Sequence, residues 1–195
     1  MGLECRVEDR EAVFAMMDKV ESVLGTPTLL LNNAGICENG NSEDFPEELW
    51  RRIIDVNLNG AFFVMQAFGR KLLLHGQPGS IVSTTSMNTQ ISCIPQHEAA
   101  YNASKAGLLQ LCRSLAVEWG SRNIRVNCIS PGYIMTEMTK RIGDPEMIRS
   151  WIKSSPIGRL GEESDLGGAV VYLLSDAAQF TTGCELMIDG AFTLI

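Results

Sequence analysis

Apolar residues recur at three- and four-residue spacing over several segments of the chain, a pattern that is typical of helices burying one face. In the first segment, Val13, Met17, Val20 and Leu24 follow this spacing, and Gly25 comes next as a stop signal. Helices are predicted over residues 8–24, 46–74 (one long helix or two), 101–118, 144–154 and 165–175.

Short apolar or β-branched runs lie between these segments, bounded by glycine, proline and small polar residues. They predict strands over residues 28–31, 80–83, 124–130 and 185–188. Strands that alternate with helices indicate a parallel sheet with helices on both faces, and hence a three-layer α/β fold. The sequence has no linker, repeat or low-complexity tract, so residues 1–195 are predicted to form a single domain.

Composition narrows the classes of function. The formal net charge of −7 argues against nucleic-acid binding, because phosphates demand a basic surface. No apolar run reaches the length of a membrane span and the N-terminus has no signal-peptide pattern, so no membrane association is expected. The six cysteines are scattered without Cys-x-x-Cys spacing, which favours a reduced compartment and predicts a cytoplasmic protein. With two histidines and no clustered ligands, no metal site is expected.

Tyr101 and Lys105 carry the strongest chemical signal. Residues four apart share one face of a helix, so the ammonium of Lys105 is placed beside the phenol of Tyr101. A free phenol has a pKa of about 10. A nearby positive charge lowers that pKa, which makes tyrosine a usable proton donor and acceptor near neutral pH. The pair alone has a plainer interpretation, an aromatic ring packed under an aliphatic stem.

Two polar clusters follow predicted strands. Residues 83–86 (Ser-Thr-Thr-Ser) end the second strand, and residues 31–35 (Leu-Asn-Asn-Ala-Gly) end the first. In an open parallel sheet, ligands bind at the carboxyl ends of the strands, so the hydroxyl cluster falls where a substrate would lie. Small residues after Tyr101, such as Ala103 and Gly107, would let a large ligand approach closely.

Taken in order, these motifs resemble the short-chain dehydrogenase/reductase family, and the resemblance covers essentially the whole chain. The matching segments are residues 32–35 (the end of the family's fourth strand), 56–58 (the catalytic asparagine), Ser86 (the catalytic serine), Tyr101 with Lys105 (the Tyr-x-x-x-Lys pair), 131–136 (a cofactor-contacting loop), and 182–183 with 188–190 (the last strand). The resemblance implies a Rossmann-like, doubly wound parallel sheet. It also implies an NAD(P)-dependent oxidoreductase that transfers hydride between a nicotinamide and a carbonyl or secondary alcohol.

Four catalytic residues follow from the resemblance. Tyr101 would give its proton to the substrate carbonyl during reduction, and Ser86 would hydrogen-bond the same oxygen. Lys105 would lower the pKa of Tyr101 and hold the nicotinamide ribose, and Asn57 would position a water that relays protons to Lys105. Two of them have structural alternatives, since Ser86 could cap a turn and Asn57 could satisfy buried backbone groups.

Cofactor contacts are implied at a further set of positions. They are Asn32, Ala34, Gly35, Tyr101, Lys105, Pro131, Gly132, Ile134 and Thr136. The expected cofactor is NADP or NAD, with NADP favoured. The alternative for Asn32 is that it braces the sheet, and for Thr136 that it caps the following helix.

The family's first strand and its Thr-Gly-x-x-x-Gly-x-Gly motif have no counterpart in this sequence. Residues 1–7 resemble the family's third strand instead, so the first two βα units, with the acidic residue that chooses between NAD and NADP, are expected to be missing. Arg6 also stands where the family commonly has an aspartate against the adenine, and a guanidinium cannot accept a hydrogen bond. The second hypothesis is therefore a truncated, cofactor-free isoform or fragment that associates with full-length subunits.

The spacing from Ser86 to Tyr101 is longer than in many family members. Residues 88–98 therefore predict an enlarged loop on the substrate side, a feature that resembles the family's polyol and ketose reductases. This loop and a lid at residues 139–155 would form the pocket. The expected substrate is a secondary alcohol, sugar alcohol or ketose, and a polyketide-like carbonyl is the alternative.

The resemblance also implies self-association, as a homodimer or tetramer, through the two long helices at residues 46–74 and 101–118. Phe62, Phe63 and Phe68 would lie either in that interface or in the core. The sequence alone does not separate the two locations.

Overall fold

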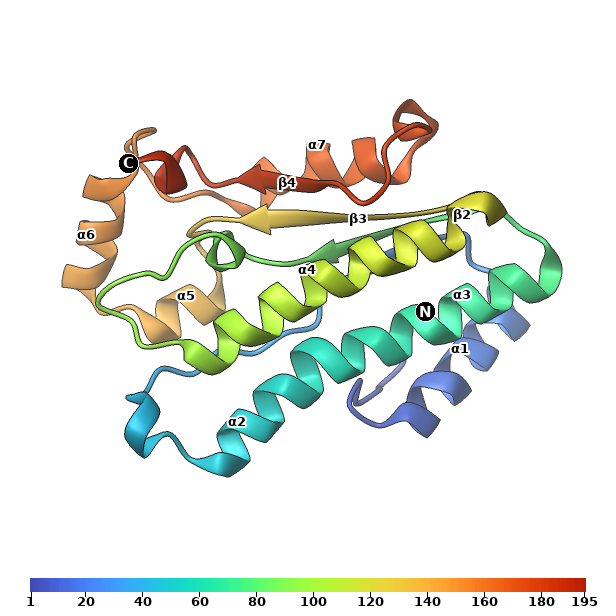
Figure 1. Ribbon diagram of the computed structural model, residues 1–195, viewed down its shortest axis with the longest axis horizontal. Coiled ribbons are helices and arrows are strands. Elements are labelled where there is room, and N and C mark those ends of the chain that lie inside the picture. Colours follow the sequence, from blue (N-terminus) through green and yellow to red (C-terminus); the bar gives the residue numbers. More distant parts are fainter.

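The computed structural model describes residues 1–141 and 143–195 in full and residue 142 by its backbone, and it shows a parallel sheet with helices on both faces (Figure 1). The described strands form one sheet in the order β1-β2-β3-β4, with every neighbouring pair parallel. The strands are β1 (Leu29–Asn32), β2 (Gly79–Thr84), β3 (Ile124–Pro131) and β4 (Glu185–Ile188). The predicted three-layer α/β fold is thereby confirmed.

The helices begin and end near the predicted positions. They are α1 (Arg10–Leu24), α2 (Glu47–Ile54), α3 (Ala61–His75), α4 (Ala99–Trp119), α5 (Glu137–Ile142), α6 (Pro145–Ser154) and α7 (Glu163–Leu174). A π-helical segment, η2 (Asp55–Gly60), joins α2 to α3 without a break. Side chains cap the starts of α1, α5, α6 and α7; at α1, the Asp9 carboxylate accepts from the Ala12 N–H at 3.1 Å.

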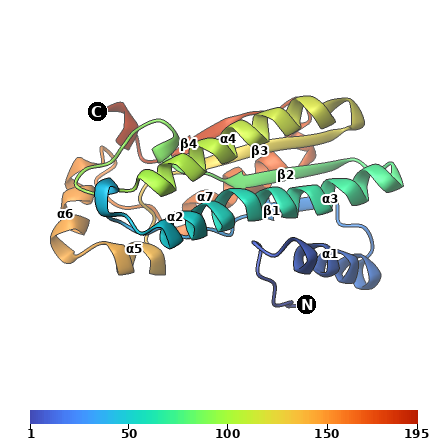
Figure 2. The same cartoon turned by 60° about the horizontal axis from the view of Figure 1, so that its bottom comes forward.

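Two hydrophobic layers hold the helices to the sheet. On one face, α3 and α4 pack on the strands and α1 packs on α3, around a core that includes Phe68, Ile81 and Val126. On the other face, α7 covers a smaller core of Val82, Ile129 and Leu173 (Figure 2). Ile81 and Val82 point to opposite faces because side chains alternate along a strand. Helices α5 and α6 lie beyond the carboxyl ends of the strands (Figure 1).

The structure corrects one prediction and adds one element. Residues 1–7, all of them described, form no strand. A strand needs a neighbour to pair with, and Val7 instead packs against η2, where a Cβ on Gly60 would lie 2.8 Å from the Val7 side chain. Arg6 is exposed and pairs with Glu8 at 2.8 Å. Helix α5 was not predicted, because its six residues are too few to show an apolar period.

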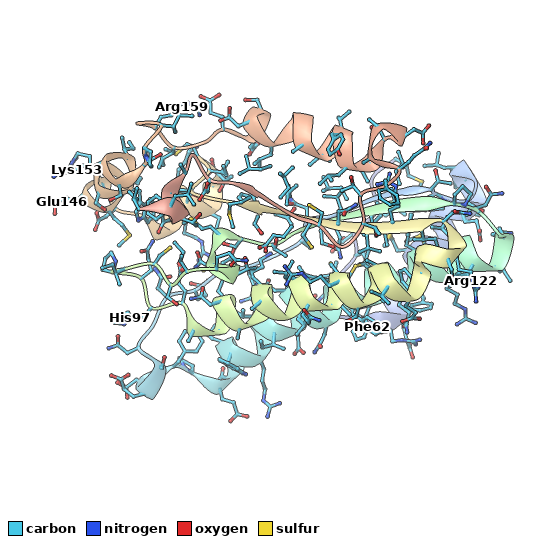
Figure 3. All side chains as sticks on the ribbon, turned by 45° about the horizontal axis from the view of Figure 1, so that its top comes forward. Phe62, His97, Arg122, Glu146, Lys153 and Arg159 are labelled. Atoms are coloured by element: carbon cyan, nitrogen blue, oxygen red, sulfur yellow. The ribbon has the colours of Figure 1, made fainter. Side chains whose placement is uncertain are left out.

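The phenylalanines of α3 take different positions. Phe68 lies fully in the core, whereas Phe62 stays half-exposed on the outer side of the helix layer (Figure 3). All six cysteines are free thiols in the part of the chain that the structure describes. Within the same residues, no helix combines the length and the apolar character needed to cross a membrane.

Candidate active site

The carboxyl ends of β1, β2 and β3 meet the first turns of α4, and this meeting point brings together the four predicted catalytic residues. Ser86 follows β2 by two residues, Tyr101 and Lys105 lie in the first turns of α4, and Asn57 lies in η2. The Asn57 amide donates to the hydroxyl of Ser104, next to Lys105 in the chain, at 3.0 Å. The residues come from three segments far apart in the sequence, so the site exists only in the folded chain.

Lys105 is 3% exposed, and its ammonium reaches back to the end of β2. The Nζ atom donates to the carbonyl oxygen of Thr84 at 2.8 Å and lies 5.6 Å from the centre of the Tyr101 ring. Burial lowers the pKa of Lys105 to about 8, because a charged amine loses hydration in the interior. At neutral pH the side chain therefore still carries its proton.

Tyr101 differs from its prediction in the direction of its pKa. Burial raises the pKa of the phenol, a hydrogen bond from Ser86 opposes this, and Cys37 and Glu98 add to the increase. The lowering of the pKa expected from Lys105 is not observed, because burial removes the phenol from water. The spacing of residues on a helix does not reveal this burial. The consequence is a phenol that keeps its proton at neutral pH.

Asn57 is fully buried, and each of its side-chain hydrogen bonds is made to another residue of the chain. Its Oδ1 accepts from the Ile36 N–H at 2.8 Å, and its Nδ2 donates to the Ile36 carbonyl at 2.9 Å and to Ser104 Oγ at 3.0 Å. The structural alternative for Asn57 is therefore observed: it ties the loop after β1 to α4. The π-helical geometry around it is typical of functional positions in helices, and its water-relay role stays a prediction.

The turn that carries Ser86 is the short 3₁₀ segment η3 (Met87–Thr89). The Ser86 hydroxyl caps it by accepting from the Asn88 N–H at 3.2 Å, as its structural alternative predicted. The Asn88 amide then donates to the Glu98 carboxylate at 2.8 Å and to the Asn102 side chain at 2.7 Å. Glu98 and Asn102 flank Tyr101 in the chain, so this amide connects the serine turn to the start of α4.

A buried carboxylate holds the other side of the same turn. Glu185, at the start of β4, accepts from the Thr89 hydroxyl, from Gln90 Nε2 at 2.7 Å and from Ser130 Oγ at 2.7 Å. Arg113 lies 3.6 Å from it, and the Glu185 side chain is 8% exposed. The Thr89 hydroxyl also lies 2.9 Å from the Ser86 carbonyl, so Glu185 reaches the serine turn through one side chain.

The sequence did not single out Asn88, Glu98 or Glu185. Asn88 and Glu98 fall in the segment predicted only as an enlarged loop, and Glu185 falls at the start of the last strand. One signal was available for Glu98, an acidic residue three positions before a predicted catalytic tyrosine. Contacts that span 96 residues, such as Thr89 to Glu185, leave no local pattern in a single sequence.

Most of the predicted cofactor positions lie at the carboxyl ends of β1 and β3. Asn32 is buried and donates to the Ala61 carbonyl at 3.0 Å, which is the bracing role given as its alternative. Thr136 caps α5 by accepting from the Thr139 N–H at 3.3 Å. Pro131 and Gly132 end β3. Ala34 and Gly35 follow β1, and Ile134 forms a bridge with Gly161.

One detail of this edge fits a nucleotide that lies close to the backbone. A Cβ on Gly35 would lie 3.3 Å from Lys105 Nζ, so the absence of a side chain keeps the space beside the ammonium open. The Thr84 hydroxyl, next to the carbonyl that receives Lys105, has no hydrogen-bond partner among the described residues, and its oxygen is closed off from the surface. Gly35 therefore leaves room for a ligand beside Lys105 at this edge.

The lid side of the site is built from aromatic rings. Tyr133 stacks on Trp151 of α6, with ring centres 4.1 Å apart. The amide of Gln96, oriented to satisfy both of its atoms, accepts from the Tyr133 hydroxyl at 2.9 Å and from the Trp151 indole N–H at 3.2 Å. This contact joins the predicted substrate loop at residues 88–98 to the predicted lid.

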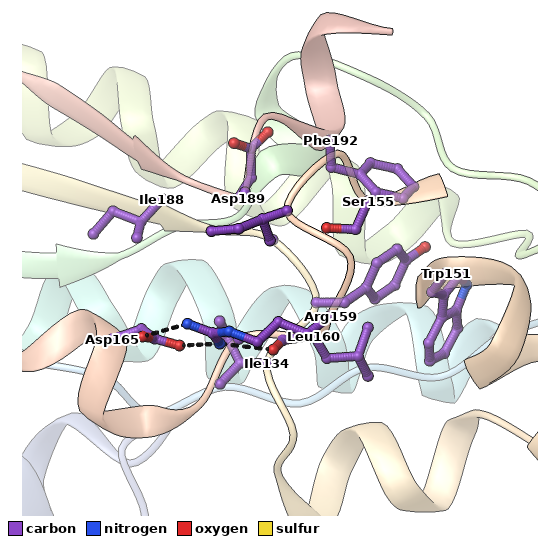
Figure 4. Close-up of a pocket in the computed structure, with 14 residues that line it drawn as sticks. Ile134, Trp151, Ser155, Arg159, Leu160, Asp165, Ile188, Asp189 and Phe192 are labelled. Atoms are coloured by element: carbon purple, nitrogen blue, oxygen red, sulfur yellow. Dashed lines mark hydrogen bonds and ion pairs between the residues drawn. The ribbon is translucent and has the colours of Figure 1, made fainter. Parts of the chain in front are cut away.

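A pocket of about 220 Å³ lies behind Tyr133, between α6 and the C-terminal turn. Figure 4 shows Arg159 bonded to Asp165 beside it, at 2.6 Å, with Phe192 on the opposite side. Trp151, from the predicted lid, lines this pocket. The four predicted catalytic residues lie outside its lining, so it is separate from the space in front of Tyr101.

Comparisons with known proteins agree on one family. The family model described as enoyl-(acyl carrier protein) reductase matches residues 1–193. The NADH-dependent L-xylulose reductase of Ambrosiozyma monospora is 41% identical over 194 residues, which are 97% of this chain and 71% of the relative. A short-chain type dehydrogenase/reductase of Mycobacterium marinum superposes with a TM-score of 0.97 at 35% identity, over 100% of this chain and 76% of that one. A gluconate 5-dehydrogenase of Burkholderia cenocepacia J2315, in complex with NADP and tartrate, gives a TM-score of 0.92 at 30% identity, over 97% of this chain and 73% of that one.

Proposed function

Since the chain belongs to the short-chain dehydrogenase/reductase family and is an NAD(P)-dependent oxidoreductase, we propose that it interconverts a ketose and a polyol, with Tyr101 as the acid and base. The observation that carries the proposal is the meeting of Tyr101, Ser86 and Lys105 at the carboxyl edge of the sheet. Ligands of open parallel sheets bind at this edge. The relatives named above are dehydrogenases and reductases, so the comparisons do not favour the truncated, inactive alternative.

The proposed reaction has two transfers: the nucleotide carries the hydride, and the protein carries the proton. A bound nicotinamide supplies the hydride that reduces the carbonyl carbon, or accepts it in the reverse direction. Tyr101 gives its proton to the carbonyl oxygen, which becomes the hydroxyl of the polyol. At neutral pH the Tyr101 phenol carries its proton, as reduction requires.

Two neighbours assist the proton transfer. Ser86 donates a hydrogen bond to the same oxygen as negative charge develops on it. Lys105 stabilises the phenolate that forms when Tyr101 has lost its proton, and its buried position makes that charge effective. Asn57 keeps the loop after β1 in place through Ile36, and a water bound beside it would return the proton through Lys105.

The nucleotide would be held along the edge from β1 to β3. Gly35 leaves room beside Lys105, whose ammonium would reach the ribose hydroxyls. Other residues assigned to the cofactor are Asn32, Ala34, Tyr101, Pro131, Gly132, Ile134 and Thr136. Both nucleotides are proposed cofactors, because the L-xylulose reductase is named for NADH and the gluconate 5-dehydrogenase contains NADP.

Association with a second copy of the chain is part of the proposal. Phe62 on α3 is half-exposed and Val117 on α4 is 86% exposed, so both long helices present apolar side chains at the surface. Phe68 is excluded from such an interface by its burial in the core. A homo-oligomer in a reducing, cytoplasmic setting is also consistent with six unpaired thiols.

The test is a spectrophotometric assay of the 195-residue chain with NADH or NADPH and a panel of neutral ketoses: xylulose, ribulose, sorbose and tagatose. We expect nucleotide oxidation that depends on the ketose, and saturable binding of at least one nucleotide by calorimetry. Failure of every ketose with both nucleotides, together with no nucleotide binding, would contradict the proposal.

A further inference from the structure

Glu98 lies immediately before α4, three residues ahead of Tyr101, and its side chain is half-buried. Asn88 Nδ2 donates to its Oε2 at 2.8 Å, and the thiol of Cys37 lies 3.7 Å from its Oε1. An ionised carboxylate offers about four acceptor positions. These two contacts therefore leave positions at which Glu98 can accept hydrogen bonds from a ligand.

The carboxylate is tied to the serine turn, because Asn88, whose amide donates to it at 2.8 Å, also donates its backbone N–H to the Ser86 hydroxyl at 3.2 Å. Burial is the largest cause of a raised pKa in four side chains from separate segments, and the Glu98 charge adds to it in each: Tyr101, Tyr133, Cys37 and Cys93. A charge acts on its neighbours over a short range inside a protein. This agrees with the contacts that Glu98 makes with Asn88 and Cys37; burial raises the pKa of the Glu98 carboxyl as well, and those two hydrogen bonds oppose the increase.

Among the described side chains, no ion pair offsets this charge. Arg141 of the lid is engaged elsewhere, with Glu38 at 2.8 Å and the Cys37 carbonyl at 2.9 Å. Lys105 donates to the Thr84 carbonyl. Glu98 is the N-cap residue of α4, and the N-terminal end of a helix stabilises a negative charge.

We infer that Glu98 selects neutral polyhydroxylated substrates over sugar acids, by accepting hydrogen bonds from substrate hydroxyls and repelling a substrate carboxylate. The inference rests on the proposed function, since it concerns the molecule that Tyr101 protonates. The choice between neutral and anionic substrates matters in this family, because the superposed relatives include an enzyme named for gluconate, which is a sugar acid. Like charges brought together in a partly buried site reduce binding strongly.

The first test compares a neutral and an anionic ketone in the same assay. The value of kcat/KM is measured for xylulose and for 5-ketogluconate, with the wild-type chain, with Glu98→Gln and with Glu47→Gln. Glutamine has the same shape and still accepts from Asn88. Glu47 is a matched control, because its carboxylate carries the same charge, is 75% exposed on α2 and pairs with Arg51.

We expect the wild-type chain to favour xylulose by about tenfold or more. Glu98→Gln should raise kcat/KM for 5-ketogluconate about tenfold, mainly through KM, and Glu47→Gln should leave the ratio unchanged. An unchanged ratio in Glu98→Gln, with both substrates still turned over, would overturn the inference and leave the proposed function standing. If the wild-type chain turned over neither substrate, the proposed function would be overturned instead.

A second measurement needs only the wild-type chain. Xylitol and xylonate are compared as inhibitors of xylulose reduction, because the two molecules differ at one terminal carbon, which is a hydroxymethyl group or a carboxylate. We expect xylonate to inhibit at least about tenfold more weakly than xylitol. Equal inhibition by the two would overturn the inference even if Glu98→Gln did not fold.

Discussion

The two walls of the catalytic space are joined to the rest of the protein in different ways. On the α4 wall, Asn57, Ser104 and Lys105 are at most 3% exposed and bond to backbone or to one another. On the lid wall, Tyr133 and Trp151 are joined to the substrate loop through the amide of Gln96. Chemistry that is common to a family belongs on the first wall, and the choice of substrate on the second. Changes to the α4 wall should act on kcat and stability, and changes to the lid wall on KM.

The largest effect is expected from Tyr101→Phe, which removes the proton donor and leaves the ring in place. We expect kcat for ketose reduction to fall about 10³-fold, with nucleotide binding and the melting temperature close to those of the wild type. The measurement is steady-state kinetics beside calorimetric titration. A variant that retained a tenth of the activity would move the acid role away from Tyr101.

The next effect is a pH dependence that belongs to Lys105. Its pKa is lowered by burial to about 8, so the ammonium that stabilises the Tyr101 phenolate is present below pH 8 and is lost above it. The rate of ketose reduction should therefore fall as pH rises through about 8. A rate that stayed level from pH 7 to pH 9.5 would separate Lys105 from the proton transfer.

The same titration has the opposite effect on stability. Between about pH 8 and the ordinary lysine pKa, the unfolded chain binds more protons than the folded chain. The contribution of Lys105 to the free energy of unfolding should thus rise across that window, and below pH 8 it should be constant. Denaturant unfolding at a series of pH values measures it, with Lys105→Met as the control that lacks the rise.

A smaller effect, on stability, is expected from Asn57→Ala. The change leaves the Ile36 N–H and carbonyl without their partner in a buried place, which should lower the free energy of unfolding by about 2 kcal/mol. Asn59→Ala is the matched control, since Asn59 lies in the same π-helical segment and bonds only to the exposed side chain of Asp55. Equal losses in the two variants would show that the segment, and not the Ile36 contact, sets the stability.

The smallest effect is expected on the lid wall, from Gln96→Ala. Loss of the amide frees Tyr133 and Trp151 from the substrate loop, so KM for the ketose should rise about fivefold while kcat stays within about twofold. Gln179→Ala, at an exposed position after α7, should change neither parameter. A fall in kcat that matched the rise in KM would show that the lid wall takes part in the chemistry, and the contrast between the walls would then be lost.

The sequence predicted which residues meet at the α4 wall better than it predicted the pKa of Tyr101. Strands and helices followed from apolar spacing, and the catalytic candidates came together because the carboxyl ends of parallel strands share one edge. The direction of the Tyr101 pKa was wrong, because a charge four residues away is visible in a sequence and the loss of water around the phenol is not. The strand expected at residues 1–7 was also wrong, since pairing depends on a neighbour that a local pattern does not reveal.

The lid wall could be located but not described. Residues 88–98 and 139–155 were predicted to form the substrate pocket, and this stays a prediction, because the pocket that Trp151 lines does not include the catalytic residues. The stack of Tyr133 on Trp151 and the Gln96 amide that joins them depend on side chains from three segments. Glu98 and Asn88 were missed for the same reason, because loop residues have no period from which their neighbours can be inferred.

The contact between Thr89 and Glu185 also affects the order in which parts of the chain can fold during synthesis. A ribosome releases the chain from the N-terminus, so α4 and the serine turn emerge well before β4 does. Until residue 185 is free to dock beside β3, the turn that carries Ser86 lacks the carboxylate that bonds to Thr89, Gln90 and Ser130. A nascent chain can therefore form its largest hydrophobic layer before β4 emerges and still have no finished catalytic turn.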